Sequence, residues 1–170
     1  MSNNYLVDIQ LTRLQWVGGP IRVTGNDRLT ILDLGGLQAI DSHIIIDDNP
    51  ILSALDLRGL QTMGSYLVIA TLDRLTTLDV SSLRIMGREL EIYKNARLSA
   101  IVAPNLTKVG GFIKIFENSE ALRPFNGLPR LSCVANGYNQ GTLSDCSSEL
   151  VNRVMSAVSE WSSTFCQNIV

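Results

Sequence analysis

The 170-residue chain contains little of what several classes of protein require. Only 18% of its residues are charged, and its net charge of −2 leaves no basic surface for nucleic-acid phosphates, so we expect no nucleic-acid partner. No apolar run approaches the ~18 residues of a membrane-spanning helix, because the densest stretch, residues 44–46, ends at Asp47. Low charge combined with abundant aliphatic residues also excludes a disordered chain.

Cysteine and histidine, which carry much metal and catalytic chemistry, are scarce. His43 is the only histidine, and it has no serine or cysteine nucleophile in a recognisable motif. The three cysteines lack the close paired spacing of a zinc site. We therefore expect no catalytic residues, no metal and no cofactor.

What the sequence does contain is a regular repeat, in which Leu14 recurs as Leu37 and the same interval then holds along the chain. Counted from this leucine at position zero, positions three, seven and nine are aliphatic or methionine in all five copies. Positions seven and nine alternate with their neighbours, as do positions eighteen and twenty, and alternation with period two predicts strands. A strand, a corner, a strand and a second corner make one coil of a parallel β-solenoid. The five leading leucines are Leu14, Leu37, Leu60, Leu83 and Leu106.

Position twelve of the repeat carries asparagine in every copy but one. A coil that turns inward leaves backbone N–H and C=O groups away from water, and a stacked carboxamide can bond them in its own coil and the next. We therefore expect a structural ladder rather than ligand contacts. Leu72 interrupts it, which predicts a locally different corner. The ladder consists of Asn26, Asn49, Asn95 and Asn118.

The composite pattern L-x-x-I-G-x-x-L-x-I-x-x-N-x-x-L-x-x-L-x-L resembles the receptor L domain. This family is the leucine-rich-like, right-handed β-helix of insulin-receptor and EGF-receptor ectodomains, with relatives among fungal cell-wall and nematode secreted proteins. Residues 83–98 match best, and the resemblance covers residues 3–133. It implies a right-handed solenoid acting as an extracellular recognition module without catalytic activity. The chain departs from many receptor L domains in having only three cysteines.

The two ends of the chain differ from the repeats between them. Residues 1–133 form the expected solenoid, which begins in mid-coil because Asn3 and Leu6 already occupy positions twelve and fifteen. An open coil end exposes core and strand edges. This predicts a fragment of a longer precursor, a covering partner, or self-association at the N-terminal end. Residues 134–170 are expected to be a cap with an amphipathic helix over about 147–163.

The cysteines and one glycosylation sequon indicate whether the protein is extracellular or cytosolic. An intact cap helix would hold its ends ~25 Å apart, too far for Cys146 to bridge Cys166. The disulfide candidates are therefore Cys133 with Cys146 or Cys166. The alternative is a cytosolic protein in which all three cysteines are reduced. Asn105 begins an N-x-T sequon and is a candidate glycosylation site. Together with the resemblance, this favours an extracellular or cell-surface protein.

The outward positions of the first strand, numbers six, eight and ten, are unusually apolar and aromatic for a sheet facing water. Such a surface is typical of an interaction site, and in the family the corresponding sheet contributes to ligand binding. The alternative is that a loop or neighbouring domain covers it. The candidate binding face comprises His43, Ile45, Tyr66, Val68, Tyr93, Phe112, Lys114 and Phe116.

Position nineteen stacks three carboxylates on successive coils: Asp33, Asp56 and Asp79. Each precedes a corner, so we expect it to accept hydrogen bonds from turn amides. Calcium, or the acidic cluster of a polysaccharide-active enzyme, is the alternative. Threonine, serine, alanine and isoleucine fill the neighbouring positions, and these do not suit catalysis.

Three hypotheses follow. The first is a non-enzymatic recognition module that binds a protein or glycan through the candidate binding face. The second is a structural wall or matrix protein that assembles through its open coil end. The third and weakest is a β-helix enzyme acting on polysaccharides.

Overall fold

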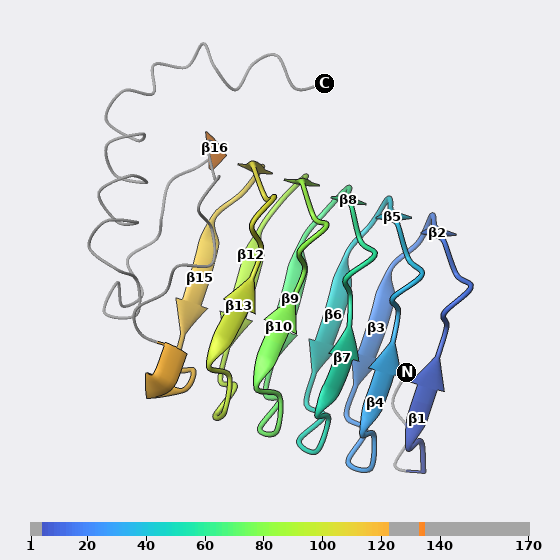
Figure 1. Cartoon of the computed structure of the whole chain (residues 1–170), viewed down its shortest axis with the longest axis vertical. Helices are drawn as coiled ribbons and strands as arrows, with labels where there is room; N and C mark the ends of the chain where they lie inside the picture. Colours follow the sequence, from blue (N-terminus) through green and yellow to red (C-terminus); the bar gives the residue numbers. More distant parts are fainter. Residues whose placement is uncertain (1–4, 123–132, 135–170) are drawn as a thin grey trace.

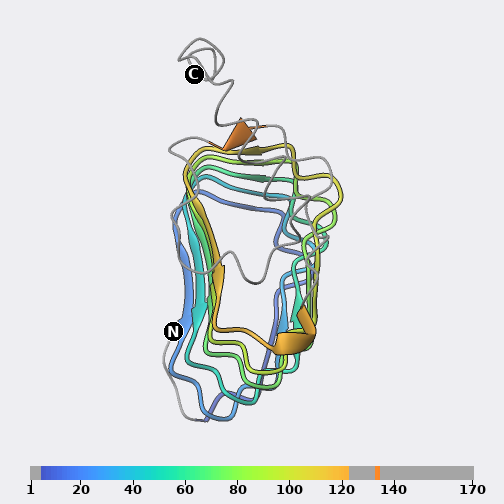
Figure 2. The ribbon, with the colours of Figure 1, turned by 90° about the vertical axis from the view of Figure 1, so that its left-hand side faces the viewer.

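Successive coils of the chain stack along one axis to form a β-solenoid. The computed structural model describes residues 5–122 and 133–134. In them the coils lie side by side, and they nearly superimpose when viewed along the stack (Figures 1 and 2). Strands pair in parallel, and each residue lies beside its counterpart in the next repeat, as Ile21 lies beside Ile44. The predicted mainly-β solenoid is confirmed; the predicted helix over 147–163 lies outside the described residues.

The longest strands form one five-stranded parallel sheet, the main sheet. Its register stacks position nine directly from coil to coil, with Ile46 beside Ile69 and Ile69 beside Ile92. These side chains are buried, because alternation along each strand turns positions seven and nine inward. The order of the sheet is β15 (Ile113–Phe116), β12 (Leu90–Tyr93), β9 (Leu67–Ala70), β6 (Ile44–Asp47) and β3 (Ile21–Thr24).

A second side of the solenoid carries three-residue strands at positions seventeen to nineteen, one residue earlier than the predicted alternation. These strands form two separate sheets, because β7 and β10 do not pair. Figure 1 shows the wider spacing between them. One sheet contains β1 (Asp8–Gln10), β4 (Ile31–Asp33) and β7 (Ala54–Asp56); the other contains β10 (Thr77–Asp79) and β13 (Ala100–Val102).

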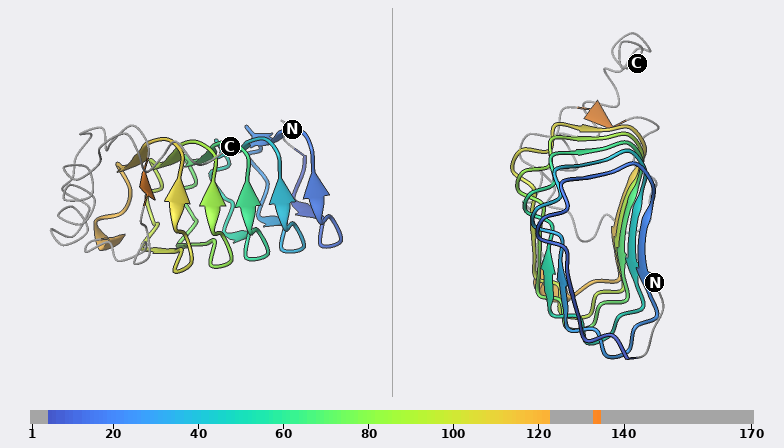
Figure 3. Two further views of the ribbon diagram at one scale, coloured as in Figure 1. Left: turned by 90° about the horizontal axis from the view of Figure 1, so that it is seen from above. Right: turned by 90° about the vertical axis from the view of Figure 1, so that its right-hand side faces the viewer.

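A third side, which the repeat pattern did not predict, carries two-residue strands at positions two and three. Two residues are too few to display an alternation, which explains why the sequence hides them. Viewed from above, the coils form a regular row (Figure 3). The strands are β2 (Trp16–Val17), β5 (Ala39–Ile40), β8 (Thr62–Met63), β11 (Ile85–Met86), β14 (Lys108–Val109) and β16 (Cys133–Val134).

The last described copy departs from the repeat. A short 3-10 helix, η1 (Glu120–Leu122), follows β15, and Leu122 rather than position-fifteen Ala121 enters the core. Strand β16 pairs with β14 in the register Lys108 to Cys133, so this last coil is longer than the regular repeat. The described part of the solenoid thus includes β16, which ends at Val134.

The corner before the main sheet depends on glycine because the coils approach closely there. A Cβ added to Gly87 would overlap the backbone carbonyl oxygen of Gly64 in the preceding coil, and one added to Gly110 would overlap that of Gly87. The corner after the main sheet uses a left-handed residue at position eleven in each coil. Its φ is 64° at Gly25 and 55°, 52°, 56° and 52° at Asp48, Thr71, Lys94 and Glu117.

The predicted asparagine ladder is present at this second corner. The Asn49 side chain is fully buried, and its Oδ1 accepts hydrogen bonds from Asn26 N (3.2 Å) and Asn26 Nδ2 (2.9 Å). Its Nδ2 donates to Val23 O (3.0 Å) and Asp47 O (2.9 Å). Asn49 therefore joins its own coil to the preceding one. Asn95 and Asn118 repeat the inter-coil bonds.

Leu72 interrupts the ladder as predicted. The corner keeps its left-handed residue, and Leu72 N still donates to Asn95 Oδ1 (3.1 Å) in the next coil. Toward the preceding coil, the leucine side chain offers Asn49 neither donor nor acceptor. The strands that follow these two corners, β7 and β10, are the neighbours that do not pair. We call the boundary between residues 48–59 and 71–82 the seam.

Candidate functional site

The eight residues of the candidate binding face lie on the outer side of the main sheet. Ile45, Val68 and Lys114 occupy the middle of their strands, and Tyr93 and Phe116 end theirs. The other three residues directly precede a strand. All eight are half-buried rather than exposed, because they pack on one another along the stack.

Two rings and a guanidinium make up one half of this face. The imidazole of His43 stacks on the phenol of Tyr66, with centroids 4.5 Å apart and planes 5° from parallel. Arg22 Nε donates to His43 Nε2 (2.9 Å), while Ser42 Oγ lies 3.3 Å from Nδ1. Partial burial, followed by the positive charge of Arg22, lowers the pKa of His43 below its usual 6.5. The ring is therefore neutral at physiological pH.

The other half contains three rings and a lysine. Tyr93 stacks on Phe116 with centroids 5.0 Å apart and planes 8° from parallel. Lys114 Nζ lies 4.2 Å from the centroid of Phe112, a cation–π contact. Partial burial, with smaller contributions from the negative charges of Asp47 and Glu91, raises the pKa of Tyr93.

Two carboxylates separate these halves. Glu89 forms an ion pair with Arg88 (3.4 Å), and Glu91 lies between Val68 and Lys114 in the register of the sheet. The face therefore alternates along the stack from apolar and aromatic to acidic and back to aromatic. Sequence reasoning placed these residues together correctly, but it did not foresee that stacking would hide much of their area.

The largest exposed apolar side chains lie elsewhere. Tyr5 is 84% exposed and Trp16 59% exposed, both in the first described coil. In that coil β1, β2 and β3 each pair with only one neighbour, and core residues such as Ile9 and Leu14 are only partly buried. The other exposed large apolar residues in the described ranges are Val7, Leu11, Ile31, Ile85 and Val102.

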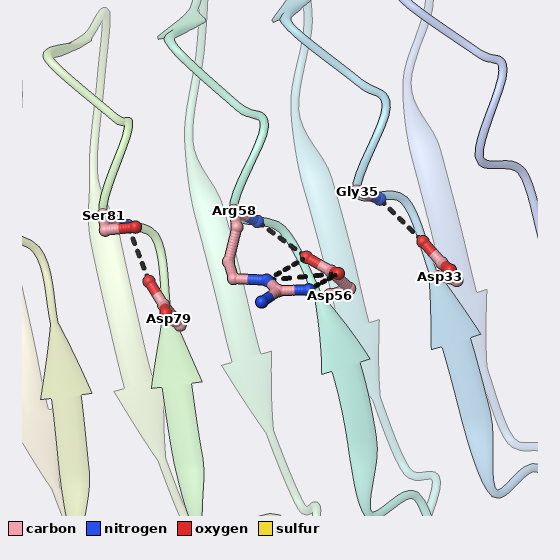
Figure 4. Close-up of polar contacts among 6 residues, drawn as sticks. All are labelled: Asp33, Gly35, Asp56, Arg58, Asp79 and Ser81. Carbon is pink, nitrogen blue, oxygen red and sulfur yellow. Dashed lines mark hydrogen bonds and ion pairs between the residues drawn. The ribbon is translucent and has the colours of Figure 1, made fainter.

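The three stacked aspartates bond to turn amides, as predicted (Figure 4). Asp33 Oδ1 accepts from Gly35 N (2.9 Å), and Asp79 Oδ1 accepts from Ser81 N (2.9 Å). Asp56 Oδ1 accepts likewise from Arg58 N (3.0 Å). One carboxylate oxygen of each aspartate thus accepts a hydrogen bond from a backbone amide of the corner that follows it.

The side chain of Arg58 adds a contact that the sequence pattern did not reveal. Its Nη2 donates to Asp56 Oδ2 (2.6 Å), and its Nε bonds both carboxylate oxygens. These bonds lower the pKa of Asp56, while Asp56 first and then Asp79 and Asp33 raise the pKa of Arg58. In Figure 4 the guanidinium lies between Asp56 and Asp79. The signal available in the sequence was a basic residue two positions after one aspartate of the stack.

A shallow hollow opens beside this ion pair. It is lined by residues of β4, β7 and β10, on both sides of the seam, and by Ser53, Arg58 and Thr76. Among the described residues, no group of three or more histidine, cysteine, aspartate or glutamate side chains is placed to hold a metal ion. The lining combines aliphatic side chains with hydroxyl and charged groups.

The remaining predicted residues have separate positions. Asn105 is exposed at a corner, where its Nδ2 donates to Ser81 O (2.8 Å). Cys133 lies in β16, whereas Cys146 and Cys166 are outside the described residues, so the disulfide candidates stay a prediction. No helix in the described ranges is long and apolar enough to cross a membrane.

No family model matches the chain, and neither any curated protein nor any solved structure matches it.

Proposed function

We propose that this protein is a non-enzymatic recognition module, extracellular or at the cell surface, that binds a protein or glycan through its candidate binding face. The carrying observation is the pair of ring stacks, His43 on Tyr66 and Tyr93 on Phe116, held on one regular sheet. Aromatic side chains fixed before binding lose little conformational entropy when a partner arrives. The resemblance to receptor L domains supports the same use of this sheet.

The geometry favours a protein over a glycan as the partner. Each stack covers one face of both its rings, and Lys114 covers one face of Phe112. A sugar that stacks on an aromatic ring needs an open ring face, and these contacts leave at most one such face on each ring. Ring edges, the methyl groups of Ile45 and Val68 and the carboxylate of Glu91 instead offer the mixed apolar and polar contacts of a protein interface.

The test compares three single variants. Tyr66→Ser and Phe112→Ser should each weaken binding by about tenfold or more, since truncating an aromatic anchor costs about 2 kcal/mol or more. Ile85→Ser is the matched control, because Ile85 is an exposed apolar residue on a different side of the solenoid.

Binding would be screened on arrays of purified extracellular proteins and of glycans, then measured by biolayer interferometry. Circular dichroism would check that each variant is folded. Loss of binding in Ile85→Ser with full binding by the two face variants would refute the assignment. Glycan turnover that disappears in Asp56→Asn would favour the enzyme hypothesis instead.

A second candidate function is assembly through the N-terminal end. It is supported by exposed Tyr5 and Trp16 beside three strand edges that each lack one partner among the described strands. Light scattering across a concentration series should then show growth of the particle, and Trp16→Arg should reduce it. A protein that stays monomeric at high concentration contradicts this candidate.

A further inference from the structure

The seam is the one described join between coils at which the second side of the solenoid is not hydrogen-bonded. At each of the other three joins that the structure describes on this side, the later coil carries asparagine at position twelve and its following strand pairs with the preceding coil. This holds for β1 with β4, β4 with β7 and β10 with β13, whose later coils contain Asn26, Asn49 and Asn95. Where the later coil carries Leu72, β7 and β10 do not pair.

The missing bonds can be identified from the neighbouring joins. Leu34 N donates to Asp56 O (3.0 Å), but among the described residues Leu57 N makes no such bond to Asp79 O. Similarly, Ser53 N donates to Thr30 O (3.1 Å), whereas Thr76 N does not bond its counterpart in the preceding coil. Leucine at position 72 also supplies no acceptor for the buried amide of Asn49. The interruption thus runs from the corner through the following strand.

Side-chain burial agrees with this interruption. Leu32 in the preceding coil and Leu78 on the β10 side of the seam both occupy position eighteen and are 1% and 0% exposed. Leu55 holds the same position on the β7 side of the seam but is only half-buried, and it lines the hollow. Solvent therefore reaches the position-eighteen leucine on the β7 side of the seam, whereas Leu78 on the β10 side stays buried.

The same two coils remain joined on their other sides. In the main sheet β6 pairs with β9 along the whole of both strands, and on the third side β5 pairs with β8. The His43–Tyr66 stack bridges this join on the outside of the main sheet. Any separation at the seam must therefore pivot on the main sheet and the third side, which both stay paired.

From this geometry we infer that the seam is a hinge: the solenoid opens between β7 and β10 before any other described join opens, and Leu72 is the residue that creates it. Opening there requires no backbone hydrogen bond of that side to break, whereas opening at β4–β7 or β10–β13 breaks a complete ladder. Segments with solvent-exposed, unbonded backbone open at the lowest free energy. The hinge separates the coils that end at or before Gly59 from the coils that follow it.

The test is amide hydrogen exchange on the whole chain, read residue by residue by NMR. In the unmodified protein, the Leu57 and Thr76 amides should exchange at least about tenfold faster than their counterparts Leu34 and Ser53. The variant Leu72→Asn supplies the missing carboxamide, so the two seam amides should slow by about tenfold or more. Equal exchange of seam and non-seam amides in the unmodified protein would overturn the inference.

Asn95→Leu is the reciprocal variant. It should create a second seam between β10 and β13, so the Val80 and Ser99 amides, which now bond Val102 O (2.9 Å) and Thr76 O (2.9 Å), should lose protection. This variant still tests the proposal if Leu72→Asn fails to fold. Unchanged exchange at Val80 and Ser99 in a folded Asn95→Leu protein would show that the carboxamide does not hold the strands together.

Discussion

Replacing Asn49 by aspartate tests the ladder with almost no change in shape. The new Oδ1 still accepts from Asn26, but the second oxygen takes the place of Nδ2. It then faces the carbonyl oxygens of Val23 and Asp47, which now lie 3.0 and 2.9 Å from Nδ2. Two attractive contacts become two repulsive ones in a site that is fully buried.

The expected cost at neutral pH is about 3–5 kcal/mol, the range for an uncompensated buried charge. This is a large share of the about 5–15 kcal/mol by which typical domains are stable. A protonated carboxyl could donate to one of the two carbonyls, so burial and these oxygens raise the pKa of the new group in the folded state. The folded protein then holds a proton that the unfolded chain releases near pH 4. Stability should therefore recover as the pH falls toward 4 and decline as it rises.

Urea unfolding followed by circular dichroism measures this cost as a shift in midpoint. Asn105→Asp is the matched control, because Asn105 is exposed and makes one inter-coil bond, to Ser81 O. We expect that variant to lose less than about 1 kcal/mol and to show little of the same pH dependence. An equal loss in both variants, or a loss at position 49 that does not shrink at low pH, would refute the ladder as a buried, oriented network.

Two further predictions concern the coil corner and the histidine. Gly87→Ala should cost about 1–3 kcal/mol in urea unfolding because its Cβ overlaps the Gly64 carbonyl, while Gly19→Ala, which meets open space, should be nearly neutral. The single histidine should titrate below 6.5 in a ¹H–¹³C NMR experiment, and Arg22→Gln should move the His43 pKa upward. Because folding favours the neutral ring, stability should fall as pH drops below 6.5; an unshifted titration would contradict the Arg22 contact.

Much of the fold could be predicted because the same sequence pattern recurs in every coil of a solenoid. Ile46, Ile69 and Ile92 recur once in each repeat, and the sheet places them directly beside one another. The role of asparagine at position twelve also followed from elementary hydrogen-bonding requirements. The interruption at Leu72 was visible as a departure from the repeat, although its extension into β7 and β10 was not.

Other features could not be predicted from the repeat. The two-residue strands of the third side are too short to show a period, and the contact between Arg58 and Asp56 depends on how the corner turns. Half-burial of the candidate binding face likewise depends on ring stacking between coils, such as Tyr93 on Phe116. Such contacts join residues of different coils or turns, and composition and spacing alone do not determine them.

The sequence by itself determined the length of the coil, the residues that point inward and the place where the ladder of carboxamides fails. These follow from local rules, since alternation, corner chemistry and buried backbone groups act within one repeat and its neighbour. Only the tertiary structure decided which rings stack, how much of the outer face is exposed and which join lacks its hydrogen bonds. Those properties depend on the spacing and tilt of whole coils, which arise when all three sides of the solenoid pack around one core.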